Sequence, residues 1–324
     1  MPLSNFKGVS TMSNDAVPAT DKGGLMGMLY RPPWVGLLAF LIVFIVQALG
    51  HTVMIVMEDV WPGEEYIYES AFAMGLFGAW LLFVGMRSEN EVTATWLGFW
   101  AGTFLWTGWV EFAFVWAGNF LAVPDLMDPN LPGEIATKAE YLVMMSSVGV
   151  LGATLVYFLL NPETKCNMFL WFQRNMGLKT GKPTKGFKRN FAAITALETI
   201  YVIWFFYLVL LFLYNEDIAG EKSPAAYTFF FLNTIWAVYL FQRLMKFWNV
   251  TTAIRYGIPT AIIAWNTVEL MGRWNLFVSI WEKPQDYALE MSLFTVAVII
   301  AAVLAVKTPS GQKARLSREE LAGK

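Results

Sequence analysis

Four ionisable side chains lie inside long apolar stretches of this sequence, namely His51, Glu111, Glu269 and Arg273. A charged group at the centre of a bilayer costs roughly 2.5–3.5 kcal/mol even on lenient insertion scales, so it is rare unless it has a partner or a task. These residues are therefore the first candidates for a functional site.

One imidazole and several carboxylates suggest metal chemistry. His51, Glu111, Glu140 and Glu269 offer nitrogen and oxygen donors of the kind that bind copper, iron, manganese or zinc. On this hypothesis they are the metal ligands of a copper or iron site, and Arg273 orients Glu269 by pairing with it. The chain has a single histidine, which excludes a haem held by two histidines of the same chain.

The same groups allow other interpretations. Glu111 has no basic residue within one turn of its own helix, so it must be protonated, paired with another helix or bound to a cation. Glu269 and Arg273 are spaced i, i+4 and can form a purely structural ion pair, while His51 can hydrogen-bond a backbone carbonyl. Together with Glu198, the buried carboxylates can also form a proton relay. Spacing within one helix does not decide between these alternatives, because the groups come from different helices.

Eight apolar segments carry these residues. Hydrophobic residues make up 56% of the 324-residue chain and charged residues 15%, whereas soluble domains carry about 25% charged residues. A membrane helix needs roughly 20 mostly apolar residues. The segments that meet this standard are 34–57, 67–86, 94–121, 140–160, 191–214, 225–245, 254–278 and 287–306. The sequence therefore predicts an all-α, polytopic integral membrane bundle with one transmembrane domain over residues 34–306.

The distribution of positive charge predicts the topology of these segments. With the N-terminus inside, the inner-side segments hold 19 of the 23 Lys and Arg residues, and the outer loops are acidic. This is the positive-inside pattern. We therefore expect eight spans with both termini in the cytoplasm, in a membrane such as the bacterial inner membrane. The expected partners are the lipid bilayer and other membrane subunits, and nucleic acid is not among them.

Three of the buried groups share one predicted depth. His51 is the 18th residue of its segment, Glu111 the 18th and Glu269 the 16th. At about 1.5 Å of rise per residue, all three lie in the outer half of the membrane. Glu198 lies nearer the inner half, and the further polar residues on the outer side are Asn119, Arg273, Glu58 and Asp59. We expect the outer-half groups to converge on one cavity open to the outer aqueous phase.

The remaining segments carry weaker signals. Residues 1–33 predict a flexible cytoplasmic N-terminus, and residues 307–324 a cytoplasmic tail. The basic loop 161–190 places an aromatic run beside a basic run, which predicts a short helix on an anionic inner leaflet, or alternatively a docking site for a cytoplasmic partner. In the Trp-rich third segment, Gly98-x-x-x-Gly102 predicts close packing against another helix.

The first four segments follow a recognisable order. An outer-half histidine is followed by an acidic aromatic loop, a Trp-rich helix with an internal glutamate, and a helix that opens with a carboxylate and a Met-rich turn. The residues that carry this order are His51, Glu58-Asp59-Val60-Trp61, Asn119-Phe120…Pro124, Pro132-Gly133, Glu140-Tyr141-Leu142-Val143-Met144-Met145-Ser146 and Asn161-Pro162. In this order, residues 34–162 distantly resemble the membrane A subunit of the particulate methane and ammonia monooxygenases.

This resemblance implies a subunit of a copper-dependent oxidising complex, in which partner subunits supply further ligands. The chain departs from the family pattern at one point. The family follows its helix-borne glutamate with an arginine four residues later, whereas Val115 stands at that place here. The Glu-x-x-x-Arg-aromatic pattern occurs instead as Glu269…Arg273-Trp274, in a segment outside the resemblance.

Three functions agree with these residues. The leading hypothesis is a membrane-embedded subunit of a metal-dependent oxidoreductase, which the resemblance narrows to a copper- or iron-dependent membrane monooxygenase. One alternative is a proton- or cation-coupled transporter that uses Glu111, Glu198 and Glu269 as relay sites. The other is a non-catalytic scaffold subunit of a membrane complex, whose buried charges only fix the register of its helices.

Overall fold

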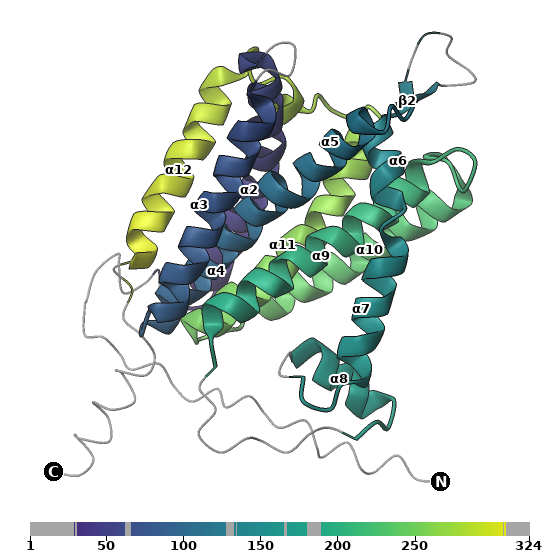
Figure 1. Ribbon diagram of the computed structural model, residues 1–324. Coiled ribbons are helices and arrows are strands. Elements are labelled where there is room, and N and C mark those ends of the chain that lie inside the picture. Colours follow the sequence, from purple (N-terminus) through teal and green to yellow (C-terminus); the bar gives the residue numbers. More distant parts are fainter. Residues whose placement is uncertain are drawn as a thin grey trace, which may run out of the picture.

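Long helices packed side by side make up most of this protein (Figure 1). The computed structural model describes residues 29, 31–61, 66–127, 133, 135–164, 167–179, 189–306 and 308. The predicted flexible N-terminus (1–33) and cytoplasmic tail (307–324) fall almost wholly outside these residues.

Every one of the eight predicted segments is helical. The helices are α2 (Trp34–Val60), α3 (Ile67–Arg87), α4 (Glu91–Leu105), the π-helix η1 (Trp106–Glu111), α5 (Phe112–Phe120), α6 (Ala139–Met145), α7 (Val148–Leu160), α8 (Asn167–Asn175), α9 (Phe191–Tyr214), α10 (Pro224–Leu244), α11 (Val250–Arg273), the 3-10 helix η2 (Ile280–Glu282) and α12 (Ala288–Val306). Two short strands, β1 (Leu126–Met127) and β2 (Ile135–Thr137), pair antiparallel. The all-α prediction is therefore confirmed.

Five stretches of the described chain are both long and apolar enough to cross a bilayer. They are α2, α3, the α6–α7 stretch Ala139–Leu160, α9 and α10. This supports an integral membrane location. The count of eight spans and the cytoplasmic placement of both termini stay predictions.

Two predicted spans differ from simple helices. The third segment changes from α4 to a π-helix and back to α5, and the π-helical turn ends at Glu111. The fourth is interrupted after Met145, where the Ser146 and Ser147 hydroxyls donate to backbone carbonyls three residues earlier. Short polar side chains offer the backbone such alternative hydrogen bonds and thereby interrupt helices.

Side-chain caps explain where several helices begin. Asn90, Asn190 and Asn249 each accept a hydrogen bond from a backbone N–H in the first turn of α4, α9 and α11, and Ser223 does the same for α10. Such caps satisfy N–H groups that have no partner within the helix. For this reason α11 begins at Val250, four residues before the predicted start of the seventh segment.

Glycines allow α4 to lie directly on α9. A Cβ atom added to Gly98 would lie 2.4 Å from the Ala192 carbonyl oxygen, and one added to Gly102 would lie 2.9 Å from that of Ala196. No side chain fits at such distances, so the two backbones touch. The predicted packing role of Gly98 and Gly102 is confirmed.

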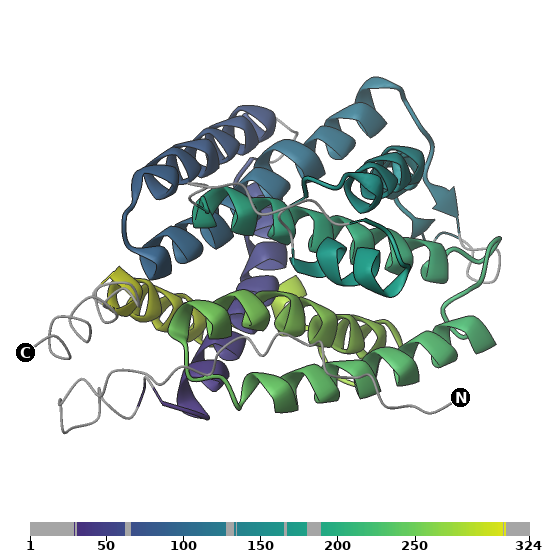
Figure 2. The ribbon, with the colours of Figure 1, turned by 90° about the horizontal axis from the view of Figure 1, so that it is seen from below.

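Helix α11 occupies the middle of the bundle. It packs against α2, α10, α9 and α4, and Figure 2 shows it between α10 at one edge and α3 at the opposite edge. A central helix turns its side chains toward other helices instead of lipid. This position explains how α11 carries charged residues in a membrane protein.

The two ends of the bundle differ. The β1–β2 hairpin lies at one end, called the hairpin end below, and α8 at the other, called the α8 end (Figure 1). The buried Gln173 amide of α8 donates to the carbonyls of Leu159 and Asn161, at 2.8 and 2.9 Å. These bonds satisfy the C-terminal carbonyls of α7 and hold α8 in place. The predicted short helix in the basic loop therefore exists, and its contact with an anionic leaflet stays a prediction.

Candidate functional site

His51 on α2 and Glu269 on α11 form an ion pair. His51 Nε2 lies 2.8 Å from Glu269 Oε1. The Trp265 indole, one turn before Glu269, donates to the same oxygen at 2.5 Å. Its ring also stacks on the His51 ring, with 6.1 Å between centroids. Glu269 Oε1 thus contacts both the His51 imidazole and the Trp265 indole.

Arg273 has a different partner from the one its spacing suggested. Arg273 Nε lies 2.9 Å from Glu221 Oε2, in the loop after α9, and Nη2 donates to the Ala136 carbonyl of β2 at 3.3 Å. The guanidinium also lies 5.2 Å from the Tyr214 ring centroid. Arg273 therefore ties the end of α11 to two neighbouring segments. The structural Glu269–Arg273 pair, which the spacing allowed, is not formed.

Glu111 is held by a tyrosine from another helix. The residue is only 7% exposed, and Tyr207 on α9 donates from its hydroxyl to Glu111 Oε1 at 3.0 Å. The Tyr207 ring packs against Trp106 and Tyr141, with centroids 6.0 and 6.1 Å apart. Among the sequence alternatives for Glu111, the structure therefore has a hydrogen bond across helices.

His51, Glu111 and Glu269 lie within electrostatic range of one another. The charge of Glu111 acts on His51, and the charges of His51 and Glu269 act on Glu111. Three separate elements, α2, η1 and α11, supply these groups. We call them the acid–base cluster. The imidazole and two of the buried carboxylates therefore lie near one another, whereas the expected cavity open to the outer aqueous phase stays a prediction.

The other predicted site residues lie at its margin or away from it. Glu140 lies in the first turn of α6, and its Oε1 atom is 3.8 Å from Lys138 Nζ. The charge of Glu140 also acts on Glu111. Further toward the hairpin end, Asn119 donates to the Tyr68 hydroxyl at 2.8 Å, Asp59 accepts from Gln285 at 2.7 Å, and Glu58 lies within electrostatic range of Glu140. None of these contacts reaches His51 directly.

Glu198 forms a second ion pair within the bundle. Arg255 Nη2 on α11 donates to both oxygens of the Glu198 carboxylate on α9, at 3.1 and 3.0 Å. The Glu198 side chain is 28% exposed and that of Arg255 14%. Arg255 thus lies inside a helix and pairs with a partly buried carboxylate. Arg255 belongs to α11 because the Asn249 cap starts this helix at Val250, earlier than the apolar pattern indicated.

Side chains that bind a metal ion must direct their donor atoms toward one point, which being near one another does not ensure. In the part of the chain that the structure describes, no group of three or more His, Cys, Asp or Glu side chains is arranged to hold a metal ion. His51 and Glu269 bind one another instead. The copper or iron site therefore stays a prediction from the sequence.

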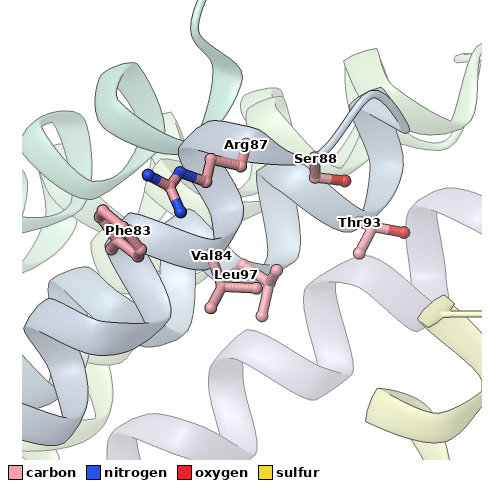
Figure 3. Close-up of a pocket in the computed structure, with 6 residues that line it drawn as sticks. All are labelled: Phe83, Val84, Arg87, Ser88, Thr93 and Leu97. Carbon is pink, nitrogen blue, oxygen red and sulfur yellow. The ribbon is translucent and has the colours of Figure 1, made fainter.

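A hollow at the α8 end is separate from the cluster. It has a volume of about 400 Å³ and is lined by Phe83, Val84, Arg87, Ser88, Thr93 and Leu97 (Figure 3). The Arg87 guanidinium lies 3.8 Å from the Phe83 ring centroid. None of the predicted site residues lines this hollow.

Three important partners were missed from the sequence. Trp265 could have been found, because it stands one turn before Glu269 on the same face. Tyr207 and Arg255 gave no such signal, since each lies on a different helix from its partner.

Comparison of this chain with protein-family models, curated proteins and solved structures finds no match. The resemblance to the monooxygenase A subunit stays an expectation from the sequence.

Proposed function

We propose that this protein is a proton-coupled membrane transporter in which the acid–base cluster binds and releases the coupling proton. The observation that carries the proposal is the 2.8 Å contact between His51 Nε2 and Glu269 Oε1, with buried Glu111 within electrostatic range. Ionisable residues on membrane helices that face the interior of a bundle are characteristic of proton relays.

The net charge of the cluster supports a proton as the species that it binds. A protonated His51 beside an ionised Glu269 has no net charge, and a protonated Glu111 leaves the whole cluster neutral. Loss of one proton from Glu111 gives the cluster one negative charge, which a low-dielectric surrounding opposes. Among the described residues, no Lys or Arg is placed within 4.0 Å of the Glu111 carboxylate to offset that charge. The cluster therefore has two charge states that favour different surroundings, as coupling requires.

The backbone is irregular at one member of the cluster. Glu111 ends a π-helical turn, and such turns occur frequently at functional sites. Pro259 lies inside α11, where it removes one backbone hydrogen bond and favours a kink. Because α11 continues without a break from Pro259 to Glu269, the π-helical turn at Glu111 is the irregularity that supports the proposal.

The metal-dependent oxidoreductase remains the second candidate. The observation in its favour is that an imidazole and two carboxylates approach each other from α2, η1 and α11, since these are the donor types that iron and copper accept. A metal would have to replace the direct His51–Glu269 contact. Metal analysis of protein purified without chelators decides this question, and a stoichiometric transition metal lost in Glu111→Gln would favour the oxidoreductase.

Proton flux in proteoliposomes tests the transporter directly. Vesicles that contain a pH-sensitive dye receive a potassium diffusion potential, and proton entry is followed over time. We expect flux with the wild-type protein and background flux with Glu269→Gln and Glu111→Gln. Glu290→Gln is the matched control, because Glu290 is an exposed carboxylate at the same end of the bundle.

Two results would reject the proposal. The first is wild-type flux no greater than that of protein-free vesicles. The second is equal flux in the wild type and in both cluster variants. Reduced melting temperature with unchanged flux would instead indicate the scaffold role.

A further inference from the structure

The short helix η2 contacts a neighbour of each member of the His51–Glu269 pair. The Trp281 ring packs on the Trp265 ring with 4.8 Å between centroids, and Trp265 is the donor to Glu269. The Thr52 hydroxyl, one residue after His51, lies 3.3 Å from the Trp281 carbonyl oxygen, within hydrogen-bond distance. These two contacts fix η2 against α11 and α2 at the hairpin end.

Glu282 follows Trp281 and is exposed. Its charge acts on His51, and the charges of Glu269 and His51 act on Glu282. The other charged groups that face it are Arg273 and the adjacent Lys283. Glu282 is therefore a carboxylate at the surface that is electrostatically connected to the buried pair.

We propose that Glu282 transfers protons between the aqueous phase at the hairpin end and the His51–Glu269 pair. This inference rests on the proposed function and adds the route by which the coupling proton reaches the cluster. An aqueous acid protonates the Glu282 carboxylate, which then passes the proton to the pair, and the reverse sequence releases it. Each step moves one proton and requires no other reactant.

The environment of Glu282 suits this role. Partial burial, and after it the negative charge of Glu269, raise the pKa of Glu282 above its usual value. A group that transfers protons works best when its pKa lies near the working pH. The contact of η2 with the Trp265 ring and with the residue after His51 holds Glu282 near the pair.

The rate of proton flux and its response to buffer test the inference. Negative charges that line a site raise the rate at which cations reach it by about tenfold or more. We therefore expect Glu282→Gln to reduce the initial flux by that factor in weakly buffered proteoliposomes. Raising the concentration of a membrane-impermeant buffer on both sides should restore it, because the buffer replaces the missing carboxylate as proton donor. Asp286→Asn, an exposed acidic residue of the same loop, should keep wild-type flux under both conditions.

Each outcome has a defined meaning. Wild-type flux in Glu282→Gln would overturn the inference and leave the proposed function intact. A loss of flux that buffer does not restore would also overturn it, since a merely structural defect does not respond to buffer. Absence of flux in the wild type would reject the proposed function, and with it this route.

Discussion

Trp265 and Glu269 stand one turn apart on α11, and the indole N–H of Trp265 donates to the same carboxylate oxygen that His51 contacts. The indole also stacks on the imidazole. A single aromatic side chain therefore contacts both partners of the ion pair.

Removal of the indole donor should weaken the fold and the cluster. A hydrogen bond to a charged group contributes about 1.5–3 kcal/mol, so Trp265→Phe should lower the free energy of unfolding by about that amount. Thermal and denaturant unfolding in detergent measure the change. Trp236→Phe is the control, because the Trp236 ring lies at an exposed position on α10. Equal stability of the two variants would contradict the prediction.

The Glu198–Arg255 pair should be worth more than a surface ion pair. Arg255 donates to both oxygens of the partly buried Glu198 carboxylate, and a hydrogen bond to a charged group contributes about 1.5–3 kcal/mol. Glu198→Gln and Arg255→Gln should each destabilise the protein strongly, whereas the double variant should cost less than the sum of the two. A double-mutant cycle by thermal unfolding measures this coupling, and additive effects would show that the two side chains do not interact.

Gly98 should not tolerate a side chain. In Gly98→Ala the new Cβ would meet the Ala192 backbone, and overpacking of this kind costs about 1–3 kcal/mol. Gly152→Ala is the matched control, because no atom lies within 4 Å of a Cβ built there. We expect a lower melting temperature for the first variant and an unchanged or higher one for the second. The reverse order would contradict direct contact between α4 and α9.

Glu282 should make stability depend on pH. Because burial and the charge of Glu269 raise the pKa of Glu282 in the folded protein, its protonated form is favoured by folding. Its contribution to stability is complete below the pKa of the unfolded chain, at about 4.3, and is lost as the pH rises through the folded pKa. Glu282→Gln should therefore gain stability relative to the wild type as the pH rises. Melting temperatures of both proteins across this range measure the difference, and parallel curves would contradict the raised pKa.

The sequence alone predicted the helical segments and the similar positions of three buried groups along them. Apolar runs of membrane length predicted all eight helical regions, and the constant rise per residue placed His51, Glu111 and Glu269 at similar heights. The spacing of Gly98 and Gly102 also predicted close helix packing, because the lack of a side chain lets a second helix approach in any helix interface.

Only the tertiary structure decided which groups meet. Position along a helix axis follows from residue number, but the direction in which a side chain points across the bundle depends on how neighbouring helices pack. Glu269 therefore binds His51 and not Arg273, although Arg273 is nearer in sequence. Close contacts such as that of Gly98 with the Ala192 backbone set which helix faces meet, and so brought Tyr207 to Glu111. These partners come from distant segments, and no local pattern in the sequence encodes their contact.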